Sequence, residues 1–101
     1  MTALDRFNSS YAGRLRIASR LRLARLLMVP LRHWFDRAEP MCVTVAAIRS
    51  GLTRRRLIDI ENATGPPVTE SELKQLATVY GETAERITAA QRRPIRDRSR
   101  H

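Results

Sequence analysis

Proline and glycine divide this chain into short segments, and each segment has the apolar spacing of a helix. The breaks fall at Pro30, at "EPMC" over residues 39–42, at Gly51 and at "ATGPP" over residues 63–67. Proline cannot continue a helix, and glycine commonly follows the last helical residue, so every helix must be short. Between the breaks, apolar residues recur at spacings of three and four and do not alternate as in a strand. We therefore predict an all-α fold with helices over residues 14–29, 31–38, 44–50, 53–62, 69–80 and 83–90.

The clearest start signal lies at residues 69–72, "TESE". Thr69 and Glu72 have the spacing of a capping box, while Val68 and Leu73 stand at the positions of a hydrophobic staple. The apolar residues that follow lie on one face and predict the buried side of this helix.

Charge is unevenly distributed along the 101 residues, whose formal net charge is +9. Residues 1–37 hold eight arginines and two acids, residues 91–101 hold five arginines and one acid, and the middle is nearly neutral. We interpret residues 1–13 as a flexible leader, 14–30 as an Arg-rich amphipathic helix, 31–90 as the folded domain and 91–101 as a disordered basic tail. Such a surplus favours a polyanionic partner, either nucleic acid or an anionic membrane surface.

The sequence lacks the residue patterns of an enzyme active site or a metal site. The single cysteine, Cys42, excludes an internal disulfide, and His33 and His101 are too far apart in sequence to suggest a zinc cluster. Neither a nucleophile–base pair nor a phosphate-binding loop occurs, so we expect no enzyme activity, no metal and no cofactor. Nothing approaches the roughly 20 apolar residues of a membrane span. We expect a protein of the reducing cytoplasm that does not bind membranes.

Three arginines occupy the first turn of the helix predicted over residues 53–62. A helix N-terminus carries partial positive charge, so cations there cost stability unless an external anion engages them. On a wheel of about 100° per residue, Leu57 and Ile60 lie on one side and can be buried. The other side carries Arg54, Arg55, Ile58 and Asp59, with Arg56 at the flank. Thr53 suits the N-cap, and Gly51 suits a left-handed turn before it.

The stretch "GLTRRRLIDIEN", followed by "TESELKQLATVYG", resembles the lambda-repressor-like (Cro/C1, XRE) family of helix-turn-helix DNA-binding proteins. The matching residues are Ala47, Gly51, Thr53, Leu57, Ile60, Glu61, Asn62, Leu73, Leu76, Ala77 and Gly81. Ala63 stands where the family usually has glycine. The resemblance covers residues 31–90 and implies a compact five-helix domain, with the Arg-rich helix over 14–30 outside it.

The resemblance also implies that the helix over residues 53–62 enters the major groove of double-stranded DNA. Arginine suits guanine, isoleucine a thymine methyl group and aspartate a cytosine amino group. We therefore expect base contacts from Arg54, Arg55, Ile58 and Asp59, and phosphate contacts from Thr44, Thr53, Arg56 and Asn62. Family resemblance further suggests a structural ion pair between Glu61 and an arginine of the first domain helix, Arg37 or Arg32.

These features predict a transcriptional regulator, such as a repressor of Cro/C1 type, that binds DNA as a homodimer. The alternative is an autoregulating antitoxin whose N-terminal helix or tail binds a small partner protein. For the Arg-rich helix itself several roles stay open: packing on the domain or on a second copy, flanking DNA, or lying on a membrane.

Overall fold

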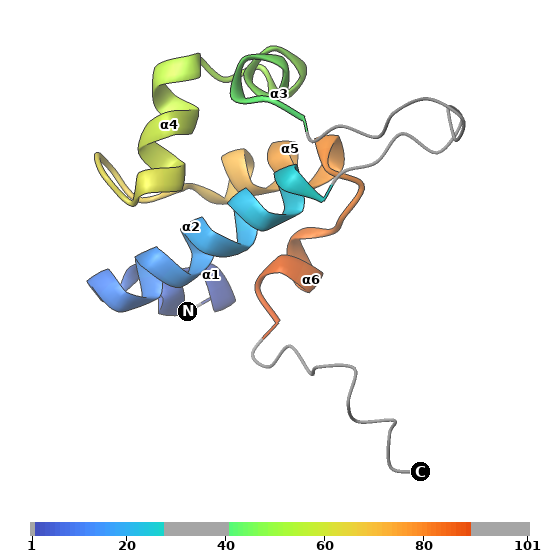
Figure 1. Cartoon of the computed structure of the whole chain (residues 1–101). Coiled ribbons are helices and arrows are strands. Elements are labelled where there is room, and N and C mark those ends of the chain that lie inside the picture. Colours follow the sequence, from blue (N-terminus) through green and yellow to red (C-terminus); the bar gives the residue numbers. More distant parts are fainter. Residues whose placement is uncertain (1, 28–40, 90–101) are drawn as a thin grey trace, which may run out of the picture.

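Six helices account for most of residues 2–27 and 41–89, which are the residues that this computed structural model describes. They are α1 (Ala3–Asn8), α2 (Tyr11–Leu26), α3 (Val43–Ser50), α4 (Arg54–Asn62), α5 (Glu70–Val79) and α6 (Ala84–Ile87) (Figure 1). No strand occurs within those two ranges, in agreement with the all-α prediction. The helix predicted over residues 31–38 and the predicted tail over 91–101 lie outside the described residues.

The N-terminal residues form a helix, so the prediction of a flexible leader over residues 1–13 is wrong. Thr2 and Asp5 make a reciprocal capping box at the start of α1, with both backbone-to-side-chain distances at 3.0 Å. Leu4 and Phe7 are buried against the rest of the chain. The Ser10 hydroxyl then caps α2, which begins at Tyr11 rather than Arg14. The short apolar pair on a six-residue helix is too weak a periodic signal to stand out.

Helix α1 crosses α2 at Gly13, where the two backbones approach closely. A Cβ atom at Gly13 would lie 2.1 Å from the carbonyl oxygen of Phe7. Glycine is required here because a backbone oxygen cannot move aside as a flexible side chain could.

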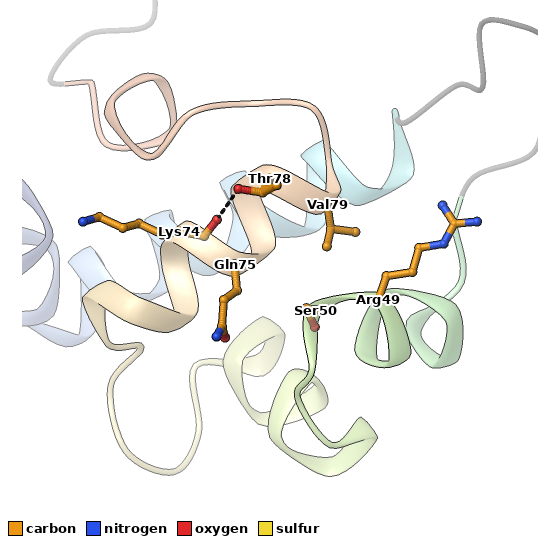
Figure 2. A pocket seen from close by; sticks show the side chains of 6 residues that line it. All are labelled: Arg49, Ser50, Lys74, Gln75, Thr78 and Val79. Carbon is orange, nitrogen blue, oxygen red and sulfur yellow. Dashed lines mark hydrogen bonds between the residues drawn. The ribbon is translucent and has the colours of Figure 1, made fainter.

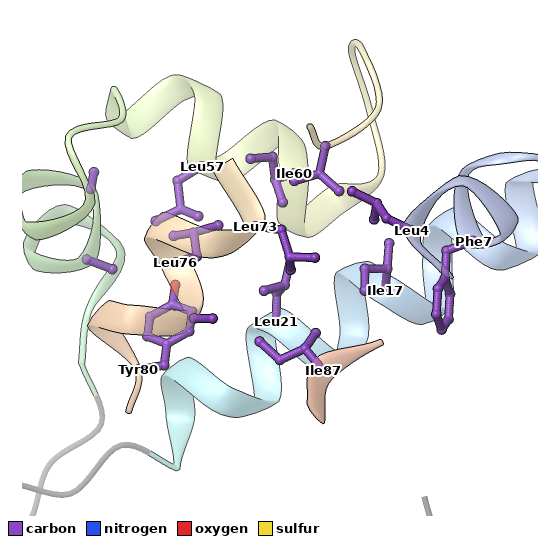
Figure 3. Packing of buried hydrophobic residues seen from close by; sticks show 14 of the residues in the cluster. Leu4, Phe7, Ile17, Leu21, Leu57, Ile60, Leu73, Leu76, Tyr80 and Ile87 are labelled. Atoms are coloured by element: carbon purple, nitrogen blue, oxygen red, sulfur yellow. The ribbon is translucent and has the colours of Figure 1, made fainter. Parts of the chain in front are cut away.

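The hydrophobic core joins all six helices (Figure 3). Its largest fully buried side chains are Leu21, Leu57, Leu73, Leu76 and Ile87. Figure 3 shows Leu21 and Leu73 in the middle of this cluster. Because α2 supplies Leu21 and packs on both α4 and α6, the Arg-rich helix belongs to the domain. Of the roles left open for this helix, packing on the domain is the one observed.

Helix α5 begins as its sequence predicts. The Thr69 hydroxyl accepts the Glu72 amide at 3.1 Å, and the Glu72 carboxylate accepts the Thr69 amide at 3.0 Å. Val68 and Leu73 are both buried, as a staple requires. Leu73, Leu76 and Ala77 form the buried side of this helix.

Candidate nucleic-acid interface

A three-residue turn, Gly51 to Thr53, joins α3 to α4. Gly51 has a φ of 81°, and the amides of Gly51 and Leu52 both donate to the Ala47 carbonyl, at 3.0 and 3.1 Å. No atom lies within 4 Å of a Cβ built at Gly51, so the left-handed backbone alone requires glycine there. The Thr53 hydroxyl accepts the Arg56 amide at 3.0 Å and caps α4. The turn therefore fixes the direction in which α4 starts.

The first turn of α4 directs two arginines outward. Leu57 and Ile60 are buried, whereas Arg54 and Arg55 are exposed, which is the separation that the helical wheel predicts. Arg54 Nε donates to the hydroxyl of Thr44 at 3.1 Å, so the starts of α3 and α4 meet. Within the described part of the chain, neither Arg54 nor Arg55 forms an ion pair with an acid. Their positive charge is thus available to an external anion.

Arg56, expected to touch phosphate, is instead engaged inside the molecule. Its guanidinium donates to both carboxylate oxygens of Glu72, at 2.7 and 2.8 Å, and to the carbonyls of Pro66 and Pro67. The hydrogen bonds from Arg56 lower the pKa of Glu72, and those to Glu72 raise the pKa of Arg56, with burial opposing both shifts. Arg56 therefore joins α4 to α5 and to the loop before it, and four of its five N–H donors are used inside the molecule.

The later residues of α4 contribute less to the outer surface than their sequence positions suggest. Ile58 and Asp59 are only half-exposed. One Asp59 carboxylate oxygen accepts the Thr64 hydroxyl at 3.1 Å, and the Asp59 carbonyl accepts the Thr64 amide at 2.9 Å. Asp59 thus stabilises the turn that follows α4. Asn62, at the end of α4, is exposed, and Ala63 adopts a left-handed backbone with a φ of 58°.

Glu61 forms a buried ion pair, but its partner is Arg25 of α2. Arg25 Nε and Nη2 donate to the two Glu61 carboxylate oxygens at 2.7 and 2.8 Å, and Nη1 donates to the Met41 carbonyl at 2.8 Å. The two side chains are 9% and 7% exposed. The expected partners, Arg37 and Arg32, lie outside the described residues, and the assignment to them is wrong. Arg25 follows Ala18 and Leu21 at helical spacing on the buried side of α2, a signal that marks it as buried but does not name its partner.

The Arg25–Glu61 ion pair affects the pKa values of the groups around it. Hydrogen bonding to Glu61 raises the pKa of Arg25 against the opposing effect of burial. Burial, aided by the Glu61 carboxylate, raises the pKa of Tyr80 to about 12. Through these hydrogen bonds Arg25 links α2 to Glu61 of α4 and to the Met41 carbonyl, just before α3.

The exposed surface of α3 adds residues that sequence reasoning missed. Ile48 is 74% exposed, and Val45 and Arg49 also lie on the outside. Ala46 and Ala47 supply the buried side instead. Thr44, Ile48 and Arg49 thus extend the exposed basic surface from α4 onto α3.

An open pocket lies between α3 and α5 and is lined in part by Arg49 and Lys74 (Figure 2). Figure 2 shows these two side chains extending away from each other, so their charges do not converge on one point. The Thr78 hydroxyl, also in the lining, donates to the Lys74 carbonyl at 2.9 Å. This geometry does not suit a small anion, and the outer surface of α3 and α4 remains the candidate site.

The described residues contain neither a membrane-spanning helix nor a metal site. None of their helices is both long and apolar enough to cross a bilayer. No three or more of their His, Cys, Asp and Glu side chains form a cluster that could hold a metal ion. No family model, curated protein or solved structure matches the chain.

Proposed function

We propose that this protein binds double-stranded DNA in a sequence-specific manner and regulates transcription, with α4 reading the major groove. The observation that carries the proposal is the exposed pair Arg54 and Arg55 on the first turn of α4. The first turn of α4 carries arginines and no acid, so its positive charge is unfavourable beside the positive end of the helix dipole. A polyanion at this end would relieve that cost.

The shape around the two arginines supports the same proposal. Two short helices joined by a tight glycine turn, with the second one basic at its start, are what a helix-turn-helix requires, and they support this proposal. In such an arrangement Arg54 and Arg55 face base edges, where arginine donates to both acceptors of guanine. We assign phosphate contacts to Thr44 and Asn62, which are exposed at the start of α3 and the end of α4.

The proposed contact set is smaller than the one that the sequence suggests. Arg56, whose donors bind Glu72, is left out, and Asp59 acts on the turn after α4. The Thr53 hydroxyl accepts the Arg56 amide, and its own O–H can still donate to a phosphate. Specificity then rests on Arg54 and Arg55, with Ile58 contributing at most a methyl contact.

The test is selection of bound sites from random duplex DNA by the full chain, followed by affinity measurements on single-base variants. Arg55→Ala should cost about 1–3 kcal/mol at one base-pair position and relax specificity there. Arg54→Ala should act likewise at a neighbouring position.

The matched control is Arg6→Ala, which removes an exposed arginine from α1 instead. It should leave base preference unchanged. The proposal fails if Arg54→Ala and Arg55→Ala both retain the parent's preference at every position while remaining folded.

An autoregulating antitoxin remains a second candidate, because α2 exposes several large apolar side chains. Such a protein would use the same DNA surface and would also bind a partner protein. Co-purification of a small partner with the full chain separates this candidate from a stand-alone repressor.

A further inference from the structure

The outer side of α2 is apolar although its inner side already supplies the core. Its large apolar side chains include Leu15 at 42% and Leu23 at 55% exposure, and Leu26 is also exposed. Figure 1 shows α2 with no other labelled helix in front of it. Contiguous exposed apolar residues of this kind mark interaction surfaces in soluble proteins.

These side chains form a narrow stripe with a defined edge on each side. On a wheel of about 100° per residue, the stripe spans about 80°. Its members are Ala12, Leu15, Ser19, Leu23 and Leu26. Arg22 lies at one edge and Arg16 at the other. We call this set the α2 stripe.

The shape of the α2 stripe suits another helix. Ala12 and Ser19 are small and lie among the leucines, so they leave room for the side chains of a closely packed helix. A surface that enters a bilayer would be expected to place bulky side chains at its centre instead.

The charges at the edges specify the chemistry of that helix. Both edge residues are arginines, and α2 contains no acidic residue anywhere between Tyr11 and Leu26. Two copies of α2 packed on each other would bring only positive charges to the edges of their interface, which disfavours a second copy. Opposite charge on the partner would pair with Arg16 and Arg22.

We propose that the α2 stripe is a docking surface for an amphipathic helix of a partner protein, one whose apolar face is bordered by Asp or Glu. The surface is separate from Arg54 and Arg55, so the proposal does not depend on DNA binding. Helix α2 is held rigidly underneath by Leu21 and Arg25, which means that the stripe is formed before the partner arrives.

The test uses the full chain and a synthetic helical peptide of about three heptads, with leucine at the core positions and glutamate at the flanking ones. A second peptide has lysine in place of every glutamate. We expect the glutamate peptide to bind and the lysine peptide not to bind. Leu23→Ser should weaken binding about tenfold.

Charge reversal at the edge gives the sharper measurement. Arg22→Glu should weaken binding of the glutamate peptide about three- to tenfold and strengthen that of the lysine peptide. Lys74→Glu, which makes the same change in net charge on α5, should change neither. Since Leu23, Arg22 and Lys74 are exposed, the melting temperatures of all three variants should match that of the parent.

Four results would overturn the proposal. They are absence of binding to the glutamate peptide, equal binding of both peptides, self-association that Leu23→Ser abolishes, and Leu23-dependent binding to anionic vesicles without peptide binding. Because Arg54 and Arg55 are unchanged in all these variants, the result of the DNA site selection does not depend on the result with the peptides.

Discussion

Gly51 has a conformation that other residues adopt at a cost. Its φ of 81° lies in the left-handed region, while the space around it is open. We expect Gly51→Ala to lower the free energy of unfolding by about 1–2 kcal/mol through backbone strain alone. Urea unfolding measures this change. An unchanged midpoint would mean that the turn between α3 and α4 rearranges without cost.

Glu72 gives the fold a dependence on pH. Its pKa is lowered by Arg56, so the pair stabilises the fold above the unfolded value near 4.5, and the contribution is lost as pH falls through the folded pKa. The urea midpoint of the parent should fall between about pH 5 and 3 more steeply than that of Glu72→Gln. Parallel curves for the two proteins would contradict this role.

At the scale of helices, the Arg25–Glu61 pair fixes the position of α4 on α2. Arg25→Met alone leaves a buried carboxylate unpaired and should cost about 3–5 kcal/mol. Arg25→Met combined with Glu61→Leu should cost clearly less than that single change, because no unpaired charge remains. Denaturant unfolding of the single and double variants completes the cycle. Simple additivity of the two changes would show that the pair is not coupled.

Local signals along the sequence predicted some helices well and others poorly, for physical reasons. Capping at Thr53 and Thr69 and the turn at Gly51 depend on neighbouring residues, so the sequence reveals them. Ala63 is left-handed at a position where the family resemblance places glycine. By contrast, the choice of Arg25 as the partner of Glu61 depends on α2 packing across α4, which no local pattern encodes.

The same distinction applies to the candidate site. The wheel correctly separated Arg54 and Arg55 from Leu57 and Ile60, because helical period alone decides this. The engagement of Arg56 by Glu72 requires the start of α5 to come within reach of the first turn of α4, and this contact is tertiary. The outward position of Ile48 likewise depends on which side of α3 meets α4 and α5.

For the molecule as a whole, the predicted arrangement on DNA is a pair of copies on inverted half-sites. In helix-turn-helix dimers the half-sites lie about 34 Å apart, one turn of the duplex. Sedimentation velocity of the protein with a selected duplex should give two copies per site, and a duplex with one half-site should bind one copy weakly. A single copy on a non-palindromic site would contradict the prediction. The α2 stripe should stay exposed in this complex.

The contact between Arg25 and the Met41 carbonyl also bears on how the chain can be re-engineered. It brings together two points 16 residues apart, one near the end of α2 and one just before α3. A covalent link engineered between these two points would therefore replace a contact that already exists, and α3 and α4 should keep their positions.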